Sequence, residues 1–179
     1  MNTFLRLTSL AATVAALALT AAPAQAASLV SATPVAKAKV KILKGLTLVS
    51  SSDLDFGTVV LSGAGAWAGD TVSVDLAGAQ TCTANLTCSG TTSAATYNVT
   101  GSNNAVVQIT IPASVTITNA ALDTLSVATS HGLGAGSTIT MPNSGNSGVD
   151  FEVGGSITLA STTPDGDYEG DMNVTADYQ

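Results

Sequence analysis

Positive charge is almost absent from this chain of 179 residues. Arg6 is its single arginine, and the only lysines stand at positions 37, 39, 41 and 44. All twelve acidic residues follow Lys44, so a short basic stretch precedes a body that has no Lys or Arg. Proteins that bind nucleic acid or anionic lipid need clustered Lys and Arg, and the composition therefore excludes both as partners of the body.

Histidine and cysteine are also scarce. His131 is the single histidine, and no motif of a nucleophile and a base surrounds it, so we expect no catalytic residue and no enzyme activity. Cys82 and Cys88 have five residues between them and are too few for a zinc site, so no metal or cofactor is expected. In an exported chain such a pair predicts a local disulfide.

Long hydrophobic runs are absent except near the start of the chain. Residues 10–19 are rich in Ala and Leu, follow Arg6, and precede Ala24-Gln25-Ala26, a site that signal peptidase accepts. The run is too short to span a bilayer, so residues 1–26 are predicted to be a secretory signal peptide and no direct membrane insertion is expected. The remaining residues, from 27 onward, are enough for one domain with a core.

Most of the mature sequence alternates between apolar and polar residues, and no helical stripe is seen. Period two is typical of strands, because successive side chains of a strand point to opposite faces. Many short strands separated by turn signals predict an all-β sandwich or barrel. The expected strands are 36–42, 46–49, 57–61, 71–76, 96–100, 107–111, 114–119, 125–129, 149–153, 156–160 and 168–178. The expected turns are 62–63, 101–104, 142–145, 154–155 and 164–166.

Two of these expected strands lie near the ends of the mature chain. In 36–42 the small apolar residues Ala36, Ala38, Val40 and Ile42 alternate with lysines, and in 168–178 the even positions are apolar or small. A terminal strand with an apolar face needs a partner, or it promotes aggregation. The first strand either joins its own domain or leaves it to complete the sheet of another subunit, and the pattern fits both.

Three motifs resemble a family of bacterial secreted domains of unknown function. They are D-L-x-F-G-x-V-V at 53–60, F-x-V-G-G-x-I-T-L at 151–159, and G-x-Y-x-G-x-M-x-V-x-A-x-Y at 166–178. That family is similar to fimbrial subunits and to spore-coat-like adhesin domains. The last motif also resembles the end of chaperone–usher pilins, which carry a glycine fourteenth from the end and a penultimate aromatic, here Gly166 and Tyr178.

The resemblance implies a fold, a mode of assembly and a set of partners. It implies an immunoglobulin-like β-sandwich at 45–179 that lacks its last strand, with an N-terminal extension, residues 27–44, that we call the arm. A periplasmic chaperone and an outer-membrane usher would handle the subunit before it joins a homopolymer or other fimbrial subunits on the cell surface. The donor face would be Ala36, Ala38, Val40 and Ile42, and the acceptor edge Gly166, Met172, Val174, Ala176 and Tyr178.

Alternative functions rest on fewer residues. A self-complete sandwich that uses its own first strand would be a monomeric secreted adhesin or matrix protein. Trp67, between glycines, is interpreted as a loop aromatic, with ligand stacking as the alternative. Asp165, Asp167 and Glu169 resemble the start of a calcium loop, but its twelfth position is Ala176 instead of Glu, which favours a solvated strand edge.

Overall fold

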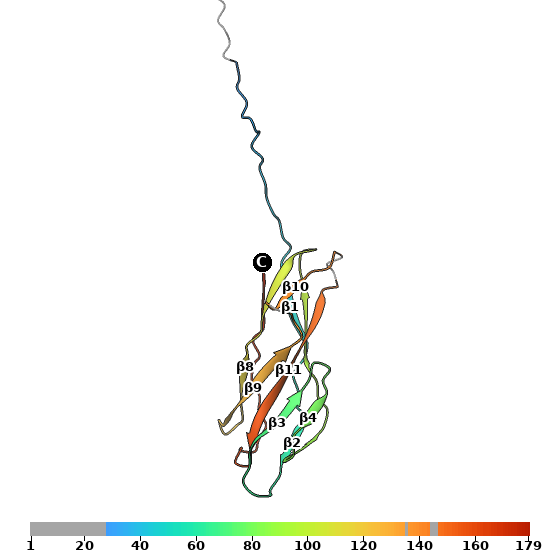
Figure 1. Ribbon diagram of the computed structural model, residues 1–179, viewed down its shortest axis with the longest axis vertical. Coiled ribbons are helices and arrows are strands. Elements are labelled where there is room, and N and C mark those ends of the chain that lie inside the picture. Colours follow the sequence, from blue (N-terminus) through green and yellow to red (C-terminus); the bar gives the residue numbers. More distant parts are fainter. Residues whose placement is uncertain (1–27, 135, 144–146) are drawn as a thin grey trace, which may run out of the picture. The chain divides into compact units, whose positions relative to one another are not determined.

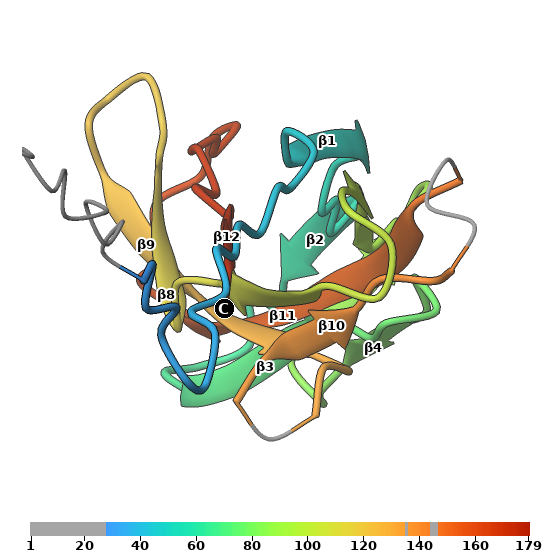
Figure 2. The ribbon, with the colours of Figure 1, turned by 90° about the horizontal axis from the view of Figure 1, so that it is seen from above.

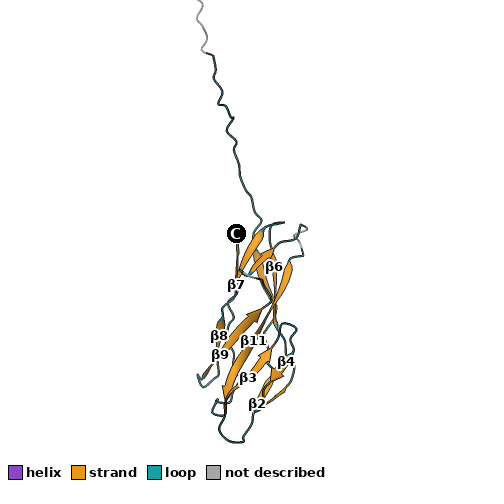
Figure 3. Ribbon diagram, in the orientation of Figure 1, coloured by secondary structure: helices purple, strands orange, loops and turns teal. Residues whose placement is uncertain are grey.

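A computed structural model describes residues 28–134, 136–143 and 147–179. Within these residues every regular element is a β-strand (Figure 3), which confirms the all-β expectation. The compact unit is Lys41–Gln179. The predicted signal peptide, residues 1–26, lies outside the described residues, as does part of the expected turn 142–145. No helix in the described part is long and apolar enough to cross a membrane.

The strands are short except for one. In chain order the described strands are β1 (Thr47–Ser52), β2 (Thr58–Leu61), β3 (Ala68–Val74), β4 (Gln80–Cys82), β5 (Leu86–Ser89), β6 (Ala95–Thr100), β7 (Val106–Thr110), β8 (Ser114–Thr118), β9 (Thr124–His131), β10 (Thr138–Thr140), β11 (Val149–Ala160) and β12 (Thr175–Tyr178). The long strand, β11, pairs antiparallel with three others. β6 and β3 follow one another along one of its sides, and β9 lies on the opposite side.

The main sheet is therefore built around β11. Its order is β1-β6-β11-β3-β4, and β9 and β8 extend it from the other side of β11. This seven-stranded sheet curls into a half-barrel (Figure 2). Two smaller antiparallel sheets, β10-β7-β12 and β2-β5, complete the compact unit (Figure 1).

The core consists of two apolar clusters. The first is centred on Val99, Val107, Ile109 and Val153, all almost fully buried, and Tyr97 and Phe151 stack in it with their ring centroids 5.4 Å apart. The second cluster consists of Val72, Leu86, Val127, Ile157 and Leu159, with half-buried side chains around it. The inward positions of the alternating segments supply both clusters, as period two predicts.

The glycine pair at 154–155 corrects one expectation. It was expected to form a turn between two strands, but both residues lie inside β11, which runs without a break from Val149 to Ala160. A Cβ at Gly155 would lie 3.0 Å from a methyl group of Val127, and one at Gly154 would meet the backbone of β3. The glycines therefore allow close packing in a strand, which is the other common use of this residue.

The two terminal segments also differ from the expectation. Residues 36–42 form no strand and are exposed in the structure, because a strand requires a neighbour that supplies its hydrogen bonds. In the C-terminal segment only Thr175–Tyr178 is a strand, since Val174 donates a hydrogen bond to the carbonyl of Met172 and interrupts the extended chain. The alternation of exposure at 171–179 is nevertheless as expected, with even positions half-buried.

Three short strands, β4, β5 and β10, were not expected. They contain three or four residues each and carry too few apolar positions for a period to be read. β4 and β5 contain Cys82 and Cys88, which form the predicted disulfide, with their Cα atoms 6.3 Å apart. Because β4 belongs to the main sheet and β5 to the β2-β5 sheet, the disulfide ties these two sheets together.

Candidate functional site

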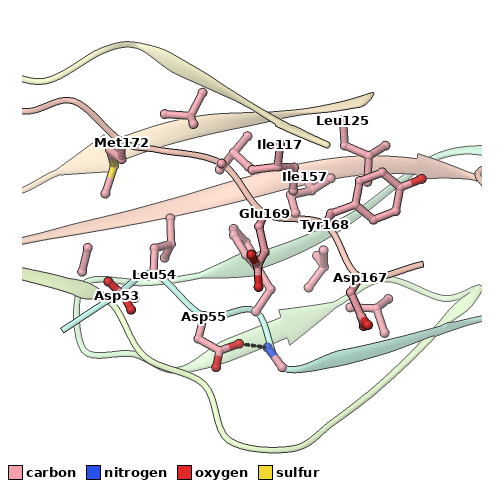
Figure 4. Close-up of a pocket in the computed structure, with 18 of the residues that line it drawn as sticks. Asp53, Leu54, Asp55, Ile117, Leu125, Ile157, Asp167, Tyr168, Glu169 and Met172 are labelled. Carbon is pink, nitrogen blue, oxygen red and sulfur yellow. Dashed lines mark hydrogen bonds between the residues drawn. The ribbon is translucent and has the colours of Figure 1, made fainter. Parts of the chain in front are cut away.

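A long groove opens along one side of the compact unit. Its volume is about 1290 Å³, and its two sides are formed by residues 53–61 and 163–173 (Figure 4). The floor consists of apolar side chains from β3, β8, β9 and β11. They are Val72, Val115, Ile117, Leu125, Val127, Ile157 and Leu159. The groove thus reaches the second core cluster, against which Leu54, Phe56 and Val59 of the first side pack.

The first side of the groove, residues 53–61, is fixed by a bridge and a turn. The backbone of Asp55 exchanges hydrogen bonds of 2.9 and 3.1 Å with Ser93. The Asp55 carboxylate accepts a hydrogen bond of 2.7 Å from the Gly57 N–H. Gly57 has φ of 64°, and a Cβ on it would lie 2.7 Å from the Ser89 carbonyl, so glycine is required at this turn into β2.

The second side, residues 163–173, is held in the same way. Glu169 exchanges backbone hydrogen bonds of 2.8 and 3.1 Å with Thr118 at the end of β8. The neighbouring Gly170 packs against the backbone of β8 so closely that a Cβ would collide with it. Gly166 lies in an exposed turn within this side, with φ of 148°, against the buried Asn119. Both sides are therefore fixed in place by backbone contacts.

Each side directs backbone groups into the groove. In an antiparallel strand alternate residues direct their N–H and C=O to one partner, and the residues between them direct theirs the opposite way. Asp55 is bonded to Ser93 and Glu169 to Thr118, and from this alternation we infer that the neighbouring Leu54 on one side and Tyr168 and Gly170 on the other direct their groups away from these partners, toward the groove. In β2 the even-numbered residues are bonded to β5. The backbone groups of Val59 and Leu61 therefore face away from β5, toward the groove. Among the described residues no strand pairs with either side across the groove.

The first cluster closes one end of the groove. The Tyr97 hydroxyl donates a 3.4 Å hydrogen bond to the Met172 carbonyl where the groove ends. Burial, and then the nearby Asp53 carboxylate, raise the pKa of Tyr97 above its ordinary value, at which a tyrosine is already protonated at neutral pH. Beyond this point the Tyr178 hydroxyl donates to the Lys44 carbonyl at 2.9 Å and accepts from the Ser102 N–H at 2.7 Å.

The expected acceptor edge is divided by this arrangement. Gly166 and Met172 line the groove, whereas Val174, Ala176 and Tyr178 pack against the first core cluster. Residues 53–61 form the opposite side of the groove. They were not expected to belong to a site. The D-L-D-F alternation at 53–56 is the signal that marks them, since Leu54 and Phe56 face the apolar interior while Asp53 and Asp55 are exposed.

Acidic side chains surround the groove. Six carboxylates line it, and no Lys, Arg or His is among its described lining residues. They are Asp53, Asp55, Asp165, Asp167, Glu169 and Asp171, and all are exposed. Figure 4 shows Asp53 and Asp55 on one side of the groove and Asp167 and Glu169 on the other. We call these six residues the acidic rim.

The remaining sequence candidates, His131 and Trp67, are not among the residues that line the groove. His131 is exposed at the end of β9. Trp67 is half-buried beside the second cluster, and its indole N–H donates a 3.1 Å hydrogen bond to the Ser62 carbonyl. In the described part of the chain no three His, Cys, Asp or Glu side chains are placed to hold a metal ion.

Fold and groove together define an all-β domain with an open groove whose floor is apolar and whose rim is acidic. The chain belongs to the family described as "Domain of unknown function (DUF4402)", whose family model matches residues 46–178. This match confirms the expected membership of a family of domains of unknown function, while the likeness to pilins stays a prediction. No curated protein matched the chain, and no solved structure matched it.

Proposed function

We propose that this protein is an exported structural subunit of a bacterial surface fimbria and that it polymerises by donor-strand exchange. In this proposal the body is an immunoglobulin-like sandwich that lacks its last strand. Residues 36–42 of one copy enter the groove of the next and supply that strand. The observation that carries the proposal is the groove with its apolar floor, which is bordered on one side by β2 and the segment before it and on the other by an extended segment held through the Glu169 bridge.

The size of the groove supports a single strand as its occupant. A strand rises about 3.3 Å per residue, lies about 4.8 Å from its neighbours, and fills a layer about 10 Å thick, so seven residues occupy roughly 1,100 Å³. The groove volume of about 1290 Å³ is of that size. A strand in this position would bond Leu54, Val59 and Leu61 on one side and Tyr168 and Gly170 on the other.

The arm has the features that such a strand needs. Its donor face, Ala36, Ala38, Val40 and Ile42, is exposed, with 82% and 85% of Val40 and Ile42 accessible. Two of the four residues are alanines, so burial contributes modestly, and ordering the arm opposes it. The fibre would therefore depend on slow release of the inserted strand as well as on affinity. Head-to-tail contacts of this kind build filaments, because they do not close.

The same groove explains why a chaperone and an usher are part of the proposal. A subunit whose groove is empty exposes an apolar surface and unpaired strand edges, and both promote aggregation. A periplasmic chaperone that lends a strand would cover them until an outer-membrane usher brings in the next subunit. The subunit would then pass from the periplasm to the cell surface and serve adhesion or biofilm formation.

A matched pair of arm variants tests the proposed function. Val40→Asp places a charge on the donor face, and Val30→Asp places the same charge on an exposed valine outside residues 36–42. We expect Val40→Asp to abolish fibres in material sheared from cells, as seen by electron microscopy, because a carboxylate cannot be buried unpaired. Val30→Asp should form fibres like the parent chain.

Two results would contradict the proposed function. One is fibre formation by the Val40→Asp variant at the parental level. The other is a full-length mature chain that purifies without any chaperone as a stable monomer whose own arm is protected from protease. That second result would favour the self-complete adhesin, in which residues 36–42 fill the groove of the same copy.

A further inference from the structure

The acidic rim carries a repeat that the proposed function does not by itself require. Asp165, Asp167, Glu169 and Asp171 occupy alternate positions along one side of the groove, and Asp53 and Asp55 do so along the other. All six are exposed, whereas Leu54, between Asp53 and Asp55, and Met172, directly after Asp171, turn inward. The carboxylates therefore stand on the solvent-exposed face of both sides of the groove.

The arm carries the opposite charge with the same repeat. Lys37, Lys39 and Lys41 alternate with the donor face, and they are exposed. Side chains two residues apart on a strand are separated by about 6.6 Å, so an arm that enters the groove as a strand would carry its lysines at that spacing. Residues on the same face of neighbouring strands stand opposite one another. When the donor face points into the groove, its lysines lie on the outer face, level with the carboxylates of both sides.

We propose that the acidic rim selects the occupant of the groove: a strand with lysines at alternate positions, which in this chain is residues 36–42 of a second copy. This inference rests on the proposed function and specifies the partner and its orientation. The rim also opposes a competing contact, because two grooves that meet edge to edge would bring like charges together. The alternating lysines thus distinguish the arm from other apolar strands.

The rim acts mainly on the rate of strand entry. Exposed ion pairs add little to equilibrium stability, because water and salt screen them. Complementary charge fields, however, raise association rates by about tenfold to a thousandfold, and the increase falls with ionic strength. Four lysines lie before the body, and six carboxylates surround the groove. Their attraction favours encounters in which the arm of one copy meets the groove of another.

A matched set of full-length variants tests the inference. Asp167→Asn with Glu169→Gln removes two rim charges, and Asp177→Asn with Glu152→Gln removes the same two charges from exposed positions outside the groove. Fibre assembly is followed by light scattering and electron microscopy at about 20 and 500 mM NaCl, a range over which exposed charges become screened. We expect high salt to slow the parent chain and the outside variant about tenfold.

The rim variant should assemble several-fold more slowly than the parent in low salt and respond less to added salt. The triple variant Lys37→Glu, Lys39→Glu, Lys41→Glu should be slower still. A second triple variant, with Asp167→Lys, Glu169→Lys and Asp171→Lys, reverses charges of the rim instead of the arm. Mixing the two triple variants should restore the assembly rate. Recovery only in the mixed sample is a result that a merely structural effect of either triple change does not give.

The inference is overturned if the rim and outside variants assemble at equal rates with equal salt dependence while Val40→Asp still abolishes fibres. In that case the arm enters the groove by its apolar face alone, and the proposed function stands. If Val40→Asp and the charge variants all assemble like the parent, the proposed function fails as well. The two failures are therefore distinguishable within one experiment.

Discussion

At the scale of the residue, Tyr178 shows how one side chain fixes the start of the body. Its hydroxyl is bonded both to the Lys44 carbonyl and to the N–H of the buried Ser102. Gly101 leaves the space for it, since a Cβ there would lie 2.6 Å from the hydroxyl oxygen. The penultimate aromatic therefore joins the last strand to the point where the arm ends and the body starts, instead of facing the groove.

Removing this hydroxyl should destabilise the domain. Tyr178→Phe leaves the Ser102 N–H without its partner, and we expect the free energy of unfolding to fall by about 1–3 kcal/mol. Tyr168→Phe is the matched control, because its hydroxyl makes one exposed hydrogen bond, to the Pro164 carbonyl. Urea unfolding of both variants measures the difference. Equal free energies of unfolding for the two variants would contradict this prediction, because the hydrogen bonds of the Tyr178 hydroxyl would then make no net contribution to stability.

At the scale of the element, the two sides of the groove depend on different supports. Residues 163–173 are held by the main sheet through β8, while β2 is held by β5 alone among the described strands. The Cys82–Cys88 disulfide ties β5 to β4 and hence to the main sheet. The disulfide thus supports the side of the groove that is less firmly attached to the main sheet.

Loss of the disulfide should therefore loosen that side. In the double variant Cys82→Ala, Cys88→Ala we expect the free energy of unfolding to fall by about 2 kcal/mol, the chain-entropy value for a loop of this size. Amide hydrogens of β2 and β5 should exchange faster relative to those of β3 and β11. Uniform acceleration over all four strands would indicate a global effect and contradict this local support.

Much of this element pattern could be predicted from the sequence, and the exceptions have physical causes. The alternation of β3, β6 and β7 places their inward residues in the core, as expected. Period two does not reveal which strands pair, however, so it could not show that Gly154 and Gly155 lie inside one long strand. It located one side of the groove at Gly166 and Met172, but the opposite side at 53–61 depends on pairing between segments distant in sequence.

At the scale of the whole molecule, the proposed assembly brings together two incomplete parts of one sequence. The body has an apolar groove with acidic sides, and the arm has an apolar face with lysines beside it. Each would be a liability for a soluble monomer, since exposed apolar surface and free strand edges promote aggregation. Directed assembly of many copies would turn both into one repeating contact.

The structure of fibres sheared from the cell surface, determined by cryo-electron microscopy, tests this central claim most directly. The proposal predicts a strand between residues 53–61 and 163–173 of each subunit, traced to residues 36–42 of the neighbouring copy. The apolar face of that strand should point to Val127 and Ile157, and its lysines should lie level with the acidic rim. An empty groove, or a groove filled by the same copy's own arm, would contradict it.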